Sequence, residues 1–162
     1  MKVTTFQMLA DKALNRTCGQ TCVDWAISML EDGHDGHYLM RLAGMLPPHN
    51  HFELADLRDR AMREQGIADL DDAEVTRTFA VETLRRALSG EVELIAAIEA
   101  IQDVCVAHDY ARDIYDFYLL YWAYSDLLES DNQWYWEGAT RENINDIIRQ
   151  QAEQFVRENS KD

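Results

Sequence analysis

Cysteine, proline and glycine are all scarce in this chain, which has three cysteines, two prolines and seven glycines among its 162 residues. Three cysteines cannot all pair within one chain, so the sequence argues against a disulfide framework and favours a reducing cytoplasm. All-β folds need many turns, which proline and glycine commonly form, and this chain has few of either residue. A disulfide scaffold and an all-β fold are therefore both disfavoured.

Positive charge and long apolar runs are also scarce. Fifteen lysines and arginines stand against thirty aspartates and glutamates, which gives a net charge of −15. Such a chain is repelled by phosphates and anionic lipids, so we expect no nucleic acid and no membrane as a partner, and a basic protein instead. The longest apolar run, 117–124, is too short to span a membrane, and the N-terminus lacks the apolar run of a signal peptide. We therefore expect a soluble cytoplasmic protein.

The familiar catalytic motifs are missing too. The sequence contains no Gly-x-x-x-x-Gly-Lys, no Gly-x-Gly-x-x-Gly and no Gly-x-Ser-x-Gly. Phosphate-loop, dinucleotide-binding and nucleophile-elbow enzymes all need one of these turns. The sequence therefore predicts that the protein is not an enzyme and has no cofactor.

What the sequence does have is helical periodicity. Apolar spacing and capping residues predict helices over residues 4–15, 17–31, 36–43, 50–66, 71–89, 94–105, 110–129 and from 140 onward. Five caps are expected: a capping box from Thr17 to Gln20, single caps at Asp35, Asn50 and Thr140, and a cap by Asp71 or Asp72 for the fifth helix. We predict one compact all-α domain of seven or eight helices over residues 1–162, with no sheet.

Two of these helices carry specific packing predictions. In the second helix Val23, Ile27 and Leu30 form the buried stripe, with Trp25 beside it. In the aromatic helix Ile114, Phe117, Tyr121 and Leu128 lie on one side, and Tyr115, Leu119 and Trp122 on the other. A helix that is apolar on two sides is central in the fold or shared with a partner.

Histidines gather in one short region, at His34, His37, His49 and His51. A His-Glu-x-x-His helix would place two imidazoles one turn apart, but Gly33 and Gly36 interrupt the helix here. A metal-dependent phosphohydrolase would need a further histidine upstream of His34, and there is none. We therefore expect no metal, and expect these histidines at helix ends and in loops.

Cys18 and Cys22 are four residues apart and share a helical face. A zinc or iron–sulfur site needs further ligands, and Cys105 is the only other thiol. A catalytic cysteine with a histidine base has no local motif in its support. We expect these thiols to be small buried core residues.

The remaining feature is a strongly acidic stretch rich in aromatic residues. Residues 91–137 contain eleven carboxylates and one basic residue, Arg112, and residues 110–136 hold ten of the sixteen aromatics. Solvated acidic tails lack such rings, whereas tyrosine and tryptophan recur as interface anchors. A core helix with a solvated acidic rim is the simpler alternative, and the helix dipole accounts for Asp109, Asp113 and Asp116. It does not account for Trp134-Tyr135-Trp136 in a polar loop.

A resemblance points in the same direction. Val23-Asp24-Trp25-Ala26, the turn from Leu30 to Asp35, the helix end Ala43-Gly44 and Phe52-Glu53 resemble the opening of small acidic all-helical bacterial proteins of unassigned role. The matching region is residues 23–67, and its motifs are packing and capping residues. In size, acidity and helicity the chain is also similar to bacterial immunity proteins. That likeness implies binding to a toxin and carries no catalytic assignment.

Three functions remain in view. The first is an immunity protein or antitoxin that occludes a basic toxin, with a nuclease preferred because nucleases bind phosphates through basic surfaces. The second is a helical adaptor or regulatory module for another basic protein, including a nucleic-acid mimic. The third is a metal-dependent hydrolase built on the four histidines. For the first, Trp122, Tyr135 and Trp136 are expected as buried anchors. The predicted partner-binding face comprises Asp109, Asp113, Tyr115, Asp116, Trp122, Asp126, Glu129, Asp131, Trp134, Tyr135 and Trp136.

Overall fold

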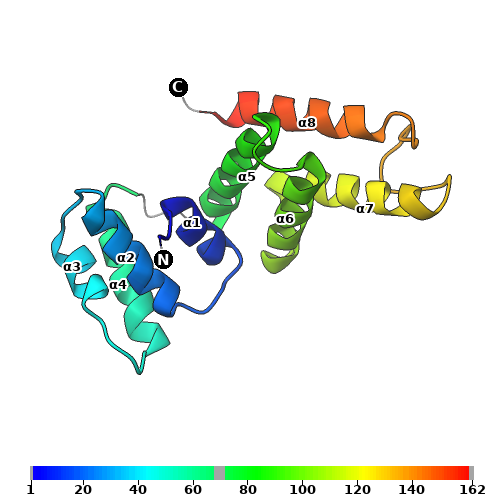
Figure 1. Ribbon diagram of the computed structural model, residues 1–162. Coiled ribbons are helices and arrows are strands. Elements are labelled where there is room, and N and C mark those ends of the chain that lie inside the picture. Colours follow the sequence, from blue (N-terminus) through cyan, green and yellow to red (C-terminus); the bar gives the residue numbers. More distant parts are fainter. Residues whose placement is uncertain (1, 68–71, 161–162) are drawn as a thin grey trace. The chain divides into compact units, whose positions relative to one another are not determined.

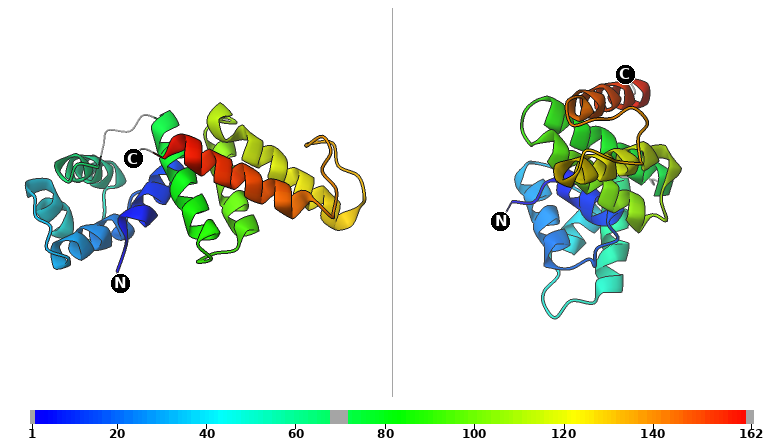
Figure 2. Two further views of the ribbon diagram at one scale, coloured as in Figure 1. Left: turned by 90° about the horizontal axis from the view of Figure 1, so that it is seen from above. Right: turned by 90° about the vertical axis from the view of Figure 1, so that its right-hand side faces the viewer.

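The computed structural model describes residues 2–67 and 72–160, and the protein is all-α (Figures 1 and 2). Within these residues there are eight α-helices, one 3₁₀ turn and no strand, as the sequence predicted. No helix in the described part of the chain is long and apolar enough to cross a membrane. The chain divides into two compact units, residues 1–71 and 72–162, and each is described by itself. That residues 1–162 form a single domain stays a prediction.

Unit 1 (residues 1–71) is a four-helix unit. Its helices are α1 (Thr5–Ala13), α2 (Gln20–Glu31), α3 (His37–Ala43) and α4 (His51–Glu64). Trp25 of α2 is completely buried, and its indole N–H donates to the Thr5 hydroxyl at 3.1 Å. The predicted stripe was correct at Val23 and wrong at Ile27, which is exposed, while Trp25 is a core residue. The indole can be buried because Thr5 satisfies its only polar atom.

The caps of unit 1 agree with the sequence only in part. Asn50 caps α4 as predicted, and its side chain accepts the backbone N–H groups of Phe52 and Glu53. The capping box expected at Thr17 is wrong, since Gly19 precedes α2 and makes no side-chain cap. A capping box lies instead at Thr4, whose partner is Gln7. Both Thr4-x-x-Gln7 and Thr17-x-x-Gln20 fit the capping-box pattern. Only the residue at which each helix begins decides which of them forms a box.

Asp35 does not cap α3, which corrects another expectation. The carboxylate of Glu64, at the end of α4, accepts the backbone N–H groups of Tyr38 and Leu39, both at 2.9 Å. The close approach depends on Gly36, because a Cβ atom there would collide with the Glu64 carboxylate. A long-range cap has therefore replaced the local one, and it ties the start of α3 to the end of α4.

Cys18 and Cys22 form a disulfide, contrary to the prediction of free thiols. Both residues are buried, as expected, and their Cα atoms lie 6.1 Å apart. That spacing is one helical turn and lies within the range a disulfide spans. The odd cysteine count argued against a framework of several bridges, but it does not exclude one local bridge. Cys105 remains a free, buried thiol.

Unit 2 (residues 72–162) carries the acidic and aromatic residues. Its elements are α5 (Asp72–Leu88), α6 (Leu94–Ala107), the 3₁₀ turn η1 (Arg112–Ile114), α7 (Tyr115–Glu129) and α8 (Ile144–Asn159). Helix α5 packs against α6 and α8, and α6 packs against α7 (Figure 1). The spacing of Leu94, Ile98, Ile101 and Cys105 predicts a buried stripe on α6; Ile98, Ile101 and Cys105 are buried as predicted, whereas Leu94 is only half-buried. Asp71, one of the two proposed caps of α5, lies outside the described residues.

Two helix starts in unit 2 differ from the prediction. Helix α7 begins at Tyr115 rather than Tyr110, because Asp109 and Tyr110 adopt left-handed backbone angles with φ of 54° and 61°. Helix α8 begins at Ile144 rather than Thr140. The Thr140 hydroxyl makes no cap for α8; its backbone N–H donates to the Asn143 side chain at 2.6 Å instead.

The buried face of α7 also differs from the prediction. Phe117, Leu120, Ala123 and Leu127 are buried, whereas Leu128 is 66% exposed. The buried positions recur at three and four residues, so they form one narrow stripe. The tyrosines and Trp122 are left outside that stripe.

Candidate protein-binding surface

An aromatic ladder runs along α7 beside its buried stripe, with Tyr110 and Tyr115 exposed and the other rings half-buried. It consists of Tyr110, Tyr115, Tyr118, Tyr121 and Trp122. Tyr118 stacks on Tyr115 with ring centres 5.4 Å apart, and meets Tyr110 edge to face at the same distance. Trp122 lies 6.4 Å from Tyr118 and 5.3 Å from Tyr121. Within α7, spacings of three and four residues place Tyr115, Tyr118 and Trp122 on one helical face. Tyr110 joins the ladder from the segment before η1.

Tyr118 is the centre of the ladder and joins three parts of the chain. Its pKa is raised by burial first, and then by the neighbouring hydroxyls of Tyr110, Tyr135 and Tyr115. Tyr135 belongs to the loop after α7, so this loop lies close to the ladder. The structure therefore brings together the two ends of the predicted partner-binding face.

The tryptophan loop, residues 130–143, is held in shape by Gln133. The Gln133 carbonyl oxygen accepts the backbone N–H groups of Tyr135 and Trp136 at 2.9 and 2.8 Å. Its amide group donates to the carbonyl oxygens of Trp136 at 2.5 Å and Ala139 at 3.2 Å. One side chain thus satisfies both donors and acceptors of an irregular backbone, which fixes the loop.

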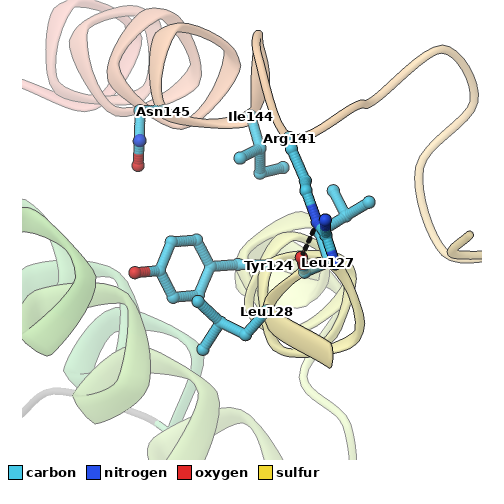
Figure 3. A pocket seen from close by; sticks show the side chains of 6 residues that line it. All are labelled: Tyr124, Leu127, Leu128, Arg141, Ile144 and Asn145. Carbon is cyan, nitrogen blue, oxygen red and sulfur yellow. Dashed lines mark hydrogen bonds between the residues drawn. The ribbon is translucent and has the colours of Figure 1, made fainter. Parts of the chain in front are cut away.

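Arg141 attaches the same loop to α7. Its Nε–H donates to the carbonyl oxygen of Leu127 at 2.7 Å (Figure 3). Its guanidinium pairs with Asp131 at 3.0 Å. The last carbonyls of a helix have no partner within the helix, so this contact is a side-chain cap from a distant residue.

This fixed loop presents large apolar side chains to solvent. Trp134 is 90% exposed, Tyr135 is 40% exposed and Trp136 is half-buried. The sequence placed the anchors at Trp122, Tyr135 and Trp136. The exposures instead favour Trp134, because Trp122 and Trp136 are partly engaged in packing. Alternation along a loop predicts that one ring points outward, but it does not say which.

A pocket of about 330 Å³ opens between the end of α7 and the start of α8. Tyr124, Leu127 and Leu128 line it from α7, while Ile144 and Asn145 line it from α8. Figure 3 shows Asn145 of α8 pointing toward the ring of Tyr124, with the side chain of Leu128 on the other side of that ring. Arg141 of the tryptophan loop also lines the pocket, so the pocket adjoins that loop.

The carboxylates of the predicted face fall into two groups. Asp113 pairs with Arg77 of α5 at 3.2 Å, and Asp131 pairs with Arg141. Both arginines lie outside residues 91–137, so counting charges along the sequence overstates the local negative charge. Within the part of the chain that the structure describes, no ion pair engages the other four predicted acids, Asp109, Asp116, Asp126 and Glu129. They contribute uncompensated negative charge.

Two further acids belong beside the ladder and were not predicted. Glu99 and Asp103 of α6 act on Tyr121, whose pKa is raised by burial first and then by these carboxylates, including a hydrogen bond with Glu99. The pKa of Asp103 is itself raised, by burial and then by Glu99. Their spacing of four residues along α6 was the available signal. Nothing in the sequence indicated that this face of α6 borders the aromatic rings.

The histidine cluster is divided in the structure. His34 and His37 are exposed near the start of α3, while His49 and His51 contact the segment that begins α2. Among the described residues no group of three or more His, Cys, Asp or Glu side chains is arranged to hold a metal ion. The four histidines therefore do not form the site that a hydrolase would need.

Comparisons with protein-family models, with curated proteins and with solved structures give no match to this chain.

Proposed function

We propose that this protein binds a basic protein partner through the tryptophan loop, the aromatic ladder and the acids around them. The observation that carries the proposal is Trp134, 90% exposed on a loop that Gln133 holds in shape. An exposed indole leaves a large apolar area in water, and its burial at an interface recovers that free energy. Because the loop is already ordered, less conformational entropy is lost on binding.

The charge of the surface indicates the kind of partner. Asp109, Asp116, Asp126 and Glu129 carry negative charge without an ion pair in the described residues. Such a surface attracts lysine and arginine side chains, accelerates association and disfavours acidic partners. A basic nuclease toxin has this complementary charge, so the proposed role is that of an immunity protein that occludes its toxin and performs no chemistry.

The test is co-expression with the product of the neighbouring gene. We expect a complex with a basic protein, and loss of that protein's toxicity or nuclease activity in the complex. Replacement of Trp134 by alanine should weaken binding by about 2 kcal/mol or more, chiefly by faster dissociation. Phe52→Ala is the matched control, because Phe52 is equally exposed but lies on α4 of unit 1.

Charge reversal tests the second part of the proposal. Asp126→Lys with Glu129→Lys should mainly slow association and reduce its dependence on salt, since steering acts over long range. A complex whose affinity and rates are unchanged by Trp134→Ala and by this double reversal, in folded protein, would show that the surface is only a solvated helix face.

A further inference from the structure

Two residue clusters that are separate in the sequence are neighbours in unit 1. Cys18 and Cys22 lie at the start of α2, and His49 and His51 lie at the start of α4. His51 Nδ1 is 2.6 Å from the carbonyl oxygen of Cys18, and His49 Nε2 is 2.7 Å from Oε1 of Gln20. Both imidazoles are therefore held against the segment that contains the two cysteines.

The hydrogen bonds determine which nitrogen of each ring carries the proton. The Gln20 amide nitrogen donates to the Asp24 carboxylate at 3.0 Å, so the Gln20 oxygen is the atom that faces His49. His49 must then donate from Nε2, and His51 must donate from Nδ1 to the Cys18 carbonyl. In the neutral rings, Nδ1 of His49 and Nε2 of His51 are left with free lone pairs.

The lone pair of His49 is in an unusual environment. Its Nδ1 atom is shielded from solvent and has no hydrogen-bond partner among the described residues. A buried polar atom without a partner costs free energy, so its presence calls for an explanation. A metal ion that binds this lone pair would explain why the Nδ1 atom is buried without a hydrogen-bond partner.

We propose that reduction of the Cys18–Cys22 disulfide creates a zinc site formed by the two thiolates, Nδ1 of His49 and Nε2 of His51. A dithiol reduces the bridge to two thiols and becomes a disulfide itself; Zn²⁺ then displaces the two thiol protons. In the oxidised form the sulfur atoms are bonded to each other, which is consistent with the lack of a metal-binding group in the described residues. Two cysteines and two histidines are a common ligand set for tetrahedral structural zinc.

The surrounding hydrogen bonds have the arrangement that zinc sites use. Histidines that bind a metal usually donate their other N–H to a carbonyl or carboxyl oxygen, which fixes ring orientation. Gln20 and the Cys18 carbonyl occupy these positions. Four protein ligands leave no open coordination position, so the site would be structural, linking the start of α2 to the start of α4.

The experiment is zinc titration of the full chain after reduction with a thiol-free phosphine, with a chromophoric chelator as competitor. We expect one zinc per chain with a dissociation constant below about 0.1 μM, and no such binding by the oxidised protein. Cobalt in place of zinc should show thiolate charge-transfer bands and the strong visible bands of a tetrahedral site. If the reduced apoprotein unfolds and zinc restores its helical circular dichroism, the result also supports the proposal.

Variants identify the ligands. Cys22→Ser and His49→Ala should each abolish high-affinity binding, whereas Gln20→Ala should weaken it by about 10- to 100-fold, as loss of an orienting partner does. The controls are His34→Ala with His37→Ala, and Cys105→Ala, which should bind zinc as the wild type does. The proposal is overturned if the reduced chain binds no zinc at this affinity, or if Cys22→Ser or His49→Ala binds zinc unchanged.

Discussion

Trp25 in unit 1 and Trp134 in unit 2 are opposite uses of the same side chain. Trp25 is completely buried and its N–H donates to Thr5, whereas Trp134 is 90% exposed on a loop. The first stabilises the fold by removing a large apolar area from water, and the second leaves that area available to a partner. The comparison shows that tryptophan content alone says little about function, because the surroundings of each ring decide its role.

The backbone around each tryptophan explains the difference. Trp25 lies within α2, where the helix supplies its backbone hydrogen bonds and packing fixes its ring. Trp134 lies in irregular backbone whose side-chain hydrogen bonds come from Gln133, and Arg141 ties the same loop to the Leu127 carbonyl of α7. Such a loop is ordered without burying its largest side chain, and that combination is suited to recognition.

The largest effect is expected from truncating the buried tryptophan. Trp25→Ala should reduce the free energy of unfolding by about 3–5 kcal/mol, because it leaves a cavity and removes the partner of Thr5. Trp134→Ala should change it by less than about 0.5 kcal/mol, as an exposed substitution does. Urea denaturation of both variants measures the difference. Equal destabilisation by the two substitutions would mean that Trp134 packs in solution and is not available to a partner.

An alkaline pH should weaken unit 2 through Cys105. Burial raises the pKa of this thiol to about 11 from an ordinary value of 9.0. A raised pKa means that the native state holds the proton more tightly than the unfolded state. The stabilisation is therefore complete below pH 9 and is lost as the pH rises toward 11, by about 2 kcal/mol in all.

The measurement is urea denaturation at pH 8 and pH 11 for the wild type and Cys105→Ala. The variant should lose less stability over this interval, because it has no thiol to ionise. Tyr118 and Tyr121 also have raised pKa values and contribute in the same direction in both proteins. An equal loss in the two proteins would show that Cys105 ionises as easily in the native state as in the unfolded state.

Loosening the tryptophan loop should have a smaller effect on stability. Gln133→Ala removes four hydrogen bonds, three of them part-buried, and water replaces part of them, so we expect a loss of about 1–2 kcal/mol. Amide hydrogen exchange at Tyr135 and Trp136 should accelerate by on the order of tenfold or more. Gln150→Ala, at an exposed glutamine of α8, is the control. Unchanged exchange at Tyr135 and Trp136 would mean that other contacts hold the loop.

The smallest effect concerns the caps near Trp25. Thr4→Ala breaks the capping box of α1, the helix that provides Thr5 to the indole, and should cost about 1 kcal/mol. Thr17→Ala should cost close to nothing, because Thr17 caps no helix in this structure. Thermal denaturation compares the two variants. If Thr17→Ala were more destabilising than Thr4→Ala, the result would mean that α2 begins at Thr17.

Much of the fold could be read from local patterns. The stripe Ile98, Ile101 and Cys105 and the Asn50 cap were predicted correctly, because each depends on residues within one helical turn. The predictions failed where the deciding contact is distant in sequence. Glu64 caps α3 from 25 and 26 residues away, and His51 reaches the Cys18 carbonyl across 33 residues. The Cys18–Cys22 disulfide is the exception, because it is local and was still missed.

The candidate surface was also predictable where it depends on local patterns and unpredictable where it depends on contacts between helices. The sequence by itself determined the all-α architecture, the net negative charge and the concentration of rings between Tyr110 and Trp136, because composition and periodicity act locally or sum over the chain. Only the tertiary structure decided which tryptophan is exposed, which acids are paired with arginines and that Glu99 lies beside Tyr121. Those properties depend on the positions of side chains from different helices, and no spacing within one helix specifies them.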